Sequence, residues 1–314
     1  MTFAIKEEAL WAAIEAVYNT EEAIVATDVL EVENLQANPA ESIKIIERNI
    51  VISSLAPQVI QYGGSLFGFS FDVEWKGGGT AGTPSRMSRL LRACGMKETI
   101  VASTSVTHEP DSDTTMHDSL TIFYREGPNM RKITGARGNA ALNVDAGGRF
   151  MFSFTFMGHI AEEVAEAAPA ETPETTAPPV FRGATFTAKA ITTAIGKISV
   201  DLGNTMSISP DPNSSDSFGQ IRIGARKVSG SFDPEAQSIA VHDFIGDLRG
   251  ATEFAIATGV LGPVAGNFVA LSLPRCQYMN IAPGDREATR IYEATFGAFP
   301  SSTPGDDDVA FQQT

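Results

Sequence analysis

The sequence predicts a mainly β protein made of two tandem antiparallel β-sandwich or barrel domains, each with a short flanking α-helix. The first observation is the segment 66–75, LFGFSFDVEW, in which aromatic and apolar residues alternate with glycine and polar residues. Period-two alternation is typical of a strand in an antiparallel sheet with one buried face. The segment 150–156, FMFSFTF, places four phenylalanines on one face in the same way. The order of these segments recurs after residue 180, which favours an internal duplication.

The bulk composition excludes several classes of protein. The 314 residues are 43% apolar and 19% charged, which suits a folded chain of about two domains. A net charge of −15 argues against tight binding of nucleic acid, because phosphate contacts need Lys and Arg, but it allows nucleic acid to slide past. No run of eighteen apolar residues predicts a membrane span, and the acidic start predicts no export signal. We therefore expect synthesis in a cytoplasm and no contact with a membrane.

Residues 1–40 are predicted to form an N-terminal arm. Leu10, Ile14, Val17 and Tyr18 recur at helical spacing, which indicates either a short helix or an arm that only a partner orders. From residue 41 to residue 160 the segments are β-like, and we interpret them as the first β domain. The segment 161–179, AEEVAEAAPAETPETTAPP, lacks aromatic residues and predicts a linker or long surface loop.

The stretch 75–90, WKGGGTAGTPSRMSRL, follows the strongest predicted strand. Gly77, Gly79 and Gly82 have the spacing of a dinucleotide-binding fingerprint. However, the strand before them alternates instead of being apolar on both faces, and no βαβ rhythm follows. We interpret the glycines as a structural turn that partly needs positive φ. A helix of about three turns is expected to start at Pro84 and to place Leu90 and Leu91 on its apolar face.

A hairpin is predicted at 103–121, with a polar tip at 108–117. The tip contains His108, Glu109, Asp111, Asp113 and His117. Imidazoles and carboxylates together can hold a metal ion. The density of Ser, Thr, Asp and Pro favours a solvated turn instead, so we predict no metal there.

The second half, residues 180–300, is predicted to repeat the first as a second β domain. It contains a helix candidate at 242–250, HDFIGDLRG, with Phe244, Ile245 and Leu248 apolar and a helix cap at His242–Asp243. Residues 301–314, SSTPGDDDVAFQQT, are expected to be a flexible C-terminal tail.

No catalytic constellation is visible in the sequence. The chain has neither a GxSxG nor an HExxH motif, and the run DPNSSDS at 211–217 lacks the glycine and terminal glutamate of a calcium loop. Cys94 and Cys276 have apolar or small neighbours and are predicted to be buried thiols. We therefore expect no enzyme activity, no cofactor and no metal.

Several segments, in their order along the chain, resemble the major tail (tail tube) proteins of long-tailed, siphovirus-like bacteriophages. They are EVENLQ, ESIKIIERNIV, FDVEWKGGGTAGTPSRMSRLLRACGMKETI, SLTIFYREGPNMRKITGARGNAALNVDAGGRFMFSFTFMG and GKISVDLGNTMSI. Gly77 to Gly82 and Leu90 to Gly95 occupy the places of the strand–glycine loop–helix motif of that family. The resemblance covers roughly residues 28–300.

This resemblance implies a structural virion protein of the phage tail, made in the host cell. Copies would join into rings, and stacked rings would form a tube through which genome DNA is ejected without specific binding. The tape measure, tail terminator and distal tail proteins would be its partners besides itself, and the 103–121 hairpin would contact a neighbouring subunit.

Two questions stay open at the level of sequence. If one chain carries two tail-tube-type domains, three chains would complete a ring with pseudo-sixfold symmetry, and we expect this homotrimer, with a true hexamer as the alternative. A soluble ligand- or carbohydrate-binding β-sandwich is the alternative function. Its aromatic residues would be expected on exposed loops, whereas here they lie within alternating strands.

Overall fold

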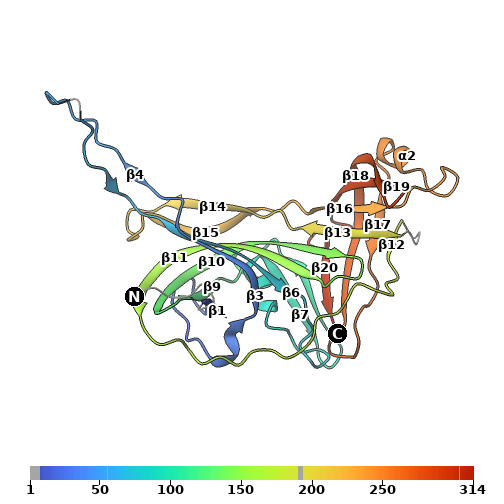
Figure 1. Ribbon diagram of the computed structural model, residues 1–314, viewed down its shortest axis with the longest axis horizontal. Helices are drawn as coiled ribbons and strands as arrows, with labels where there is room; N and C mark the ends of the chain where they lie inside the picture. The colour runs from blue at the N-terminus through green and yellow to red at the C-terminus, as the bar shows by residue number, and fades with distance from the viewer. Residues whose placement is uncertain (1–7, 55, 190–193, 304) are drawn as a thin grey trace.

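A computed structural model describes residues 8–54, 56–189, 194–303 and 305–314, and it confirms the mainly β antiparallel fold (Figure 1). The strands of the first half are β1 (Glu8–Ile14), β2 (Val29–Leu30), β3 (Val32–Glu41), β4 (Ile45–Ile46), β5 (Gln61–Tyr62), β6 (Leu66–Glu74), β7 (Met96–Val101), β8 (Ser105–Pro110), β9 (Leu120–Glu126), β10 (Asn129–Asp145) and β11 (Met151–Ala165). Those of the second half are β12 (Thr187–Ala188), β13 (Ile195–Asp201), β14 (Thr205–Pro210), β15 (Phe218–Ala225), β16 (Ser229–Pro234), β17 (Phe254–Ala257), β18 (Val269–Arg286), β19 (Thr289–Ala298) and β20 (Ala310–Gln313). The helical elements are η1 (Ala26–Asp28), α1 (Ser88–Ala93) and α2 (Phe244–Arg249).

One continuous layer of strands runs through both halves of the chain. Its order is β3-β6-β11-β10-β13-β16-β19-β18, and every neighbouring pair is antiparallel. The alternating segments build this layer as predicted: Phe71 lies opposite Phe154, and both rings are buried in the core. The two halves are joined by the pairing of β10 with β13, which runs from Ala141 opposite Asp201 to Asp145 opposite Lys197.

The strand order of this layer repeats. Counted along the sequence, β3-β6-β11-β10 and β13-β16-β19-β18 both have the order first, second, fourth, third. In each half the last two strands are a long hairpin, β10–β11 and β18–β19. The duplication expected from the sequence therefore has a topological counterpart. The domain boundaries at 40/41, 160/161 and 179/180 stay a prediction, because one sheet crosses between the halves.

A second layer covers the inner face of the first. The N-terminal part of β10 pairs with β9, which continues through β1 to β2, and the N-terminal part of β18 pairs with β20, which continues through β8 to β7. Aromatic side chains fill the space between the layers. The ring of Trp75 lies 5.4 Å from Phe152 and 5.6 Å from Phe311, measured between ring centres.

The N-terminal segment is a strand, so the predicted helix is wrong. β1 pairs with β2 on one side and β9 on the other, and Leu10, Trp11 and Ala12 are fully buried. A strand buried on both faces is apolar on both faces, and its apolar residues therefore also satisfy a helical period. In the described part of the predicted arm, residues 8–40, the strands β1, β2 and β3 belong to the sheet, and residues 1–7 lie outside the described residues.

The C-terminal segment is ordered where a flexible tail was expected. β20 pairs with β18 on one side and β8 on the other, and Phe311 is fully buried. The polar run SSTPGDDD is followed by a short apolar–polar alternation in the last residues, and this alternation fits a central strand. The prediction of a flexible tail for 301–314 is therefore wrong for residues 310–313.

The predicted linker follows the surface of the molecule. β11 continues to Ala165, and residues 166–179 contain no strand. The loop is fixed at two points, because the Thr172 amide donates to the carbonyl of Ala26 at 2.9 Å and Asn267 Nδ2 donates to that of Ala177 at 2.7 Å. These bonds join it to both halves of the chain.

Candidate assembly and lumen surfaces

The outward face of the eight-stranded layer is polar along its whole width, and we call it the polar face. In register, one row across it is Glu33, Asp72, Ser153, Ala141, Asp201, Ser229, Gly297 and Gln277, and the next is Glu74, Met151, Asn143, Ser199, Ser231, Thr295 and Asn280. Most of these side chains are short and uncharged, and the charged residues in the two rows are acidic. Such a face offers little apolar surface to bury and few cations to bind phosphate.

The acidic residues of the polar face are held by local partners. Asp72 accepts from Asn34 Nδ2 at 2.7 Å, and Asp201 accepts from Asn139 Nδ2 at 2.7 Å. Glu74 lies between two cations, with Lys76 Nζ at 3.0 Å and the Arg149 guanidinium on its other oxygen. Burial would raise the pKa of Glu74, but these two cations lower it below its ordinary value of 4.5.

The lowered pKa of Glu74 predicts a pH-dependent contribution to stability. A carboxyl whose pKa is lower in the folded state stabilises the fold above its unfolded pKa, and this contribution is lost as the pH falls through the folded value. We expect Glu74→Gln to lower the Tm by about 2 °C at pH 7 and to have a shrinking effect below the ordinary value of 4.5. Glu293→Gln, an exposed carboxylate of β19, is the control. An effect of Glu74→Gln that does not change with pH would contradict the assignment.

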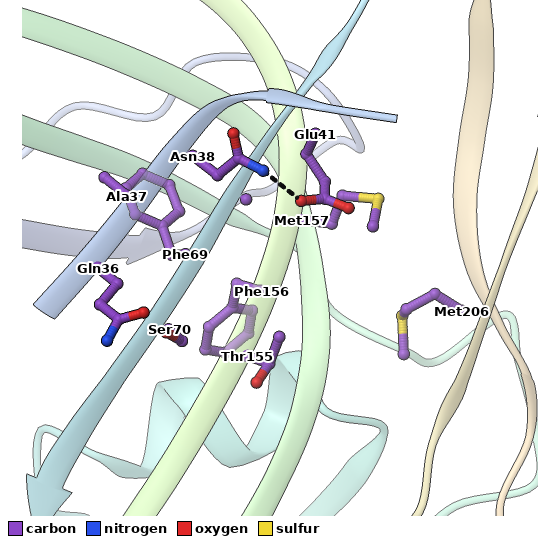
Figure 2. Close-up of a pocket in the computed structure, with 11 residues that line it drawn as sticks. Gln36, Ala37, Asn38, Glu41, Phe69, Ser70, Thr155, Phe156, Met157 and Met206 are labelled. Atoms are coloured by element: carbon purple, nitrogen blue, oxygen red, sulfur yellow. Dashed lines mark hydrogen bonds between the residues drawn. The ribbon is translucent and has the colours of Figure 1, made fainter. Parts of the chain in front are cut away.

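A groove opens at one end of the polar face, between β3, β6, β11 and β14. Its volume is about 320 Å³, and Gln36, Ser70, Thr155, Met157 and Met206 are among its lining residues (Figure 2). The side chains of Asn38 and Glu41, joined by a 2.8 Å hydrogen bond, lie at its rim. Its aromatic residues, Phe69 and Phe156, are buried in the core and present no ring to solvent. A sugar-binding site would need exposed rings, so this groove gives no support to the carbohydrate alternative.

The segment 43–62 is an exposed apolar arm, which we call the apolar arm. β4 and β5 pair at its base, Ile45 opposite Tyr62, and the chain between them extends away from the body of the molecule (Figure 1). Its exposed apolar residues are Ile43, Ile45, Ile46, Ile50, Val51, Ile52, Val59, Ile60 and Tyr62. Val51 is 100% exposed. Exposed apolar residues gathered on one segment are typical of surfaces that contact another macromolecule.

The glycine loop joins the two halves of the chain. The amide of Gly77 donates to Asn267 Oδ1 and that of Gly79 to the Gly266 carbonyl, both at 2.9 Å. Gly79 and Gly82 have φ values of +79° and +73°. A Cβ at Gly82 would lie 2.5 Å from the backbone nitrogen of Ser103, so this position has no space for a side chain.

The helix after the loop is shorter than predicted. α1 has six residues and begins at Ser88, so Pro84 lies in the preceding turn and not in the first helical turn. Residues 80–87 form turns, in one of which the Thr83 amide donates to the Thr80 carbonyl. The first turn of the expected helix therefore does not form. Leu90 and Leu91 are fully buried in the core, on the apolar face that the sequence indicated.

The hairpin predicted at 103–121 does not form. β8 pairs with β7 and β20, whereas β9 pairs with β1 and β10, so the two strands are never neighbours. His108 was expected in a solvated tip but is fully buried, with Nε2 3.3 Å from Glu98 Oε2. Sequence could not show this, because the strand that covers β8 comes from the C-terminus.

The other residues of the predicted tip are spread over a short loop. Glu109 remains on β8, and Asp111 and Asp113 shape a turn in which the Asp113 amide donates to Asp111 Oδ1 at 2.8 Å. His117 is buried, with Nε2 2.9 Å from the Asp111 carbonyl. The described residues contain no cluster of three or more metal-ligating side chains. A contact of this loop with a neighbouring subunit remains a prediction.

Arg137 fixes this loop to both halves of the chain. Its guanidinium is buried and donates to the carbonyls of His117, Asp118 and Ile221 at 2.5, 3.1 and 2.9 Å. The Tyr18 ring lies over it, with the guanidinium carbon 5.1 Å from the ring centre. Ile221 is in β15, so one side chain holds the first half to the second.

Replacing Arg137 should destabilise the whole chain. Arg137→Met removes three hydrogen bonds, two of them buried, and leaves their carbonyl acceptors without these donors, which we expect to cost about 3 kcal/mol. Arg290→Met, whose exposed guanidinium contacts Asp285, should change stability by less than about 0.5 kcal/mol. Denaturant unfolding of the two variants measures the difference, and equal effects would show that the Arg137 contacts contribute little.

Several other sequence predictions agree with the structure. Cys94 and Cys276 are free and buried, and burial raises the pKa of the Cys276 thiol to about 12. Asp243 caps α2, accepting from the Gly246 amide at 2.8 Å. The apolar arm was missed, because residues 43–52, IKIIERNIVI, were included among the β-like segments of the first domain. The signal available in the sequence was that apolar residues occupy both faces of this segment.

The structure thus defines a mainly β protein with a broad polar sheet face and an exposed apolar arm. A family model described as phage tail tube protein matches residues 6–298, nearly the whole chain. The chain therefore belongs to the phage tail tube protein family, a structural family of the virion tail. The comparison with curated proteins found no match. Neither described helix has the length or apolar composition needed to cross a membrane.

Proposed function

We propose that three copies of this chain form a ring and that stacked rings make the tail tube through which DNA leaves the virion. The observation that carries the proposal is the repeated strand order within one continuous sheet. Each half supplies four strands in the same arrangement, so one chain has the form of two tandem subunits. Three such chains have six equivalent units, and a closed ring with threefold symmetry is a common way to bury matching edges.

The polar face is the surface that we assign to the lumen. Most side chains in its two rows are short and uncharged, and these rows contain no Lys or Arg, so it offers DNA few binding contacts. The chain as a whole, with a net charge of −15, has the same character. DNA would therefore pass along this surface without being retained.

The apolar arm is the element that we assign to stacking between rings. It projects beyond the body of the molecule and carries its apolar residues in solvent (Figure 1). Burial in an adjacent ring would remove this apolar area from water at about 25 cal/mol per Å². The tape measure, tail terminator and distal tail proteins are the further partners that this function implies, and synthesis takes place in the host cell cytoplasm.

Electron microscopy and native mass spectrometry of the purified full-length chain test the proposal. We expect rings with the mass of three chains, together with tubes of stacked rings. A true hexamer would appear as rings with the mass of six chains and would refute the trimer while keeping the tube. A strictly monomeric protein at high concentration that binds a small ligand saturably would instead support the soluble binding protein as the alternative.

A further inference from the structure

The geometry points to the turn between β14 and β15 as a clamp that sets the direction of the apolar arm. We call residues 211–217 the clamp turn. The clamp turn belongs to the second half of the chain, whereas the arm belongs to the first. This inference rests on the proposed function, because the arm is the element assigned to stacking between rings.

The apolar arm has a counterpart in the second half. The arm lies between β3 and β6, and the β14–β15 hairpin lies between β13 and β16, which are the equivalent strands in the repeated order. Both are antiparallel hairpins, with Ile45 opposite Tyr62 in the arm and Met206 opposite Ile223 in β14–β15. The two hairpins therefore occupy equivalent places in the two halves.

A short sequence repeat relates the two hairpins more closely. Residues 70–74 read SFDVE and residues 231–235 read SFDPE, starting on the equivalent strands β6 and β16. Extended back without a gap, this repeat aligns two apolar residues of the arm with two of β15: Ile60 with Ile221, and Tyr62 with Ile223. The two residues of β15 are buried, whereas the two of the arm are exposed. The arm thus offers to another molecule the side chains that its counterpart buries within the chain.

The β14–β15 hairpin buries its apolar side chains against the first half of the chain. Phe218 and Ile221 form a small core cluster with Leu66 of β6, and Met157 of β11 packs against this cluster. Burial of this apolar area holds the hairpin on the first half. The hairpin therefore lies beside the base of the arm and not over its own half (Figure 1).

Direct contacts join the clamp turn to the base of the arm. Lys44 Nζ donates to the Ser217 carbonyl at 2.9 Å and lies 3.8 Å from the centre of the Phe218 ring, where a cation is attracted to the aromatic face. A Cβ on Gly64 would lie 1.8 Å from the Asp216 carbonyl oxygen. The backbone of the arm and the backbone of the clamp turn are therefore in direct contact.

Lys44 also closes the base of the arm. Its amide donates to the Gly64 carbonyl, and its carbonyl accepts from the Gly63 amide, both at 2.8 Å. The described residues of the arm belong to none of the core clusters. Contacts at the base therefore decide the direction in which the arm extends from the body of the molecule.

The clamp turn is itself held on the body by Asp216. One carboxylate oxygen accepts from Ser214 Oγ at 2.5 Å and from the Phe218 amide at 3.0 Å, and the other accepts from His159 Nδ1 at 2.6 Å. Burial raises the pKa of this carboxyl, but the hydrogen bonds outweigh burial and lower the pKa below its ordinary value of 3.8. The carboxylate is therefore ionised and ties the turn to β11.

A chain of hydrogen bonds continues from His159. While Nδ1 donates to Asp216, the ring in its neutral form accepts at Nε2 from the Tyr18 hydroxyl at 3.2 Å. The Tyr18 oxygen in turn accepts from the Ile221 amide at 2.7 Å. Burial raises the pKa of Tyr18 to about 12, so the hydroxyl keeps the proton that it donates. Both β15 and the clamp turn are therefore bound to the first half.

The clamp makes presentation of the arm depend on both halves of the chain. The arm comes from the first half, and the groups that contact its base come from residues 216–218 of the second. The arm is therefore directed only in a chain whose second half has folded. Because the counterpart hairpin of each chain serves as the clamp, a ring of three chains presents three arms and not six.

Two variants test the clamp. Lys44→Met removes the donor and the charge of this side chain but keeps most of its length, and Asp216→Ala removes the bond to His159. In hydrogen exchange of the full-length protein, the backbone amides at positions 44 and 63 should exchange about tenfold faster in both variants than in the wild type. In electron microscopy, both variants should form rings and shift the population from tubes to single rings. The matched control is Lys97→Met, at an exposed lysine of β7, which should change neither result.

Wild-type exchange at these amides in both variants would overturn the inference, and so would normal tubes formed by variants whose arm exchanges faster. Thermal unfolding shows whether Asp216→Ala lowers the stability of the whole chain. If it does, Lys44→Met alone decides, because that side chain is only half-buried. A wild-type chain that forms neither rings nor tubes would instead overturn the proposed function, and the exchange measurement would still decide whether the clamp holds the arm.

Discussion

Replacing residues 47–60 by a two-residue Asn-Gly turn is expected to abolish tubes while leaving single rings. The ends of the replaced segment, Ile46 and Gln61, already lie opposite each other, and Asn-Gly closes a two-residue hairpin with the required twist. The removed residues are mostly exposed and belong to none of the core clusters in the described part of the chain. Ring formation should therefore survive, and only the apolar contact between rings should be lost.

Sedimentation and electron microscopy measure this result, and the free energy of unfolding is expected to change by less than about 1 kcal/mol. A second variant keeps the length of the arm and replaces its most exposed apolar residues, Ile50→Ser/Val51→Ser/Ile52→Ser. It should also shift the population from tubes to rings, because the loss is one of apolar area and not of reach. Normal tubes formed by both variants would contradict the role of the apolar arm.

Gly82→Val is expected to prevent stable folding. The backbone at Gly82 has a φ of +73°, which a β-branched residue strongly disfavours. In addition, its Cβ would lie 2.5 Å from Ser103 N and 2.7 Å from Val101 O, both backbone atoms that cannot turn away as a side chain can. We expect a loss of more than about 4 kcal/mol, beyond the largest common effects of single substitutions.

Two alanine variants separate the cost of the left-handed backbone conformation from the cost of a steric clash. Gly147→Ala and Gly79→Ala introduce a side chain at φ values of +77° and +79°, where no atom beyond the adjacent residues lies within 3.8 Å of the new Cβ. Each should cost about 1–2 kcal/mol, the cost of the left-handed conformation alone. Gly82→Ala should cost clearly more, as measured by thermal unfolding. Equal costs at all three positions would show that the close contact at Gly82 is relieved by a small backbone shift.

The sequence was most informative where local pattern decides structure. The alternation in 66–75 predicted β6 and its buried face, and the repeat of segment order predicted a duplication that the sheet topology reproduces. The helix expected near Leu10 failed because burial on both faces removes the period that distinguishes strand from helix. The prediction of a solvated tip around His108 is wrong, because the strand that covers it, β20, lies about two hundred residues further along the sequence.

The candidate surfaces were only partly accessible from sequence for the same reason. The small and acidic residues of each strand of the polar face can be recognised in the sequence. Their combination into one face depends on the pairing of β10 with β13, which joins the two halves. The apolar arm has the composition of a core strand, and only the absence of a covering layer makes it an exposed surface.

A three-dimensional reconstruction of the assembled tube tests the central proposal most directly. The expected ring contains three chains related by a threefold axis, with the polar face toward the lumen. Six full chains in each ring, or a polar face on the outside of the tube, would contradict it.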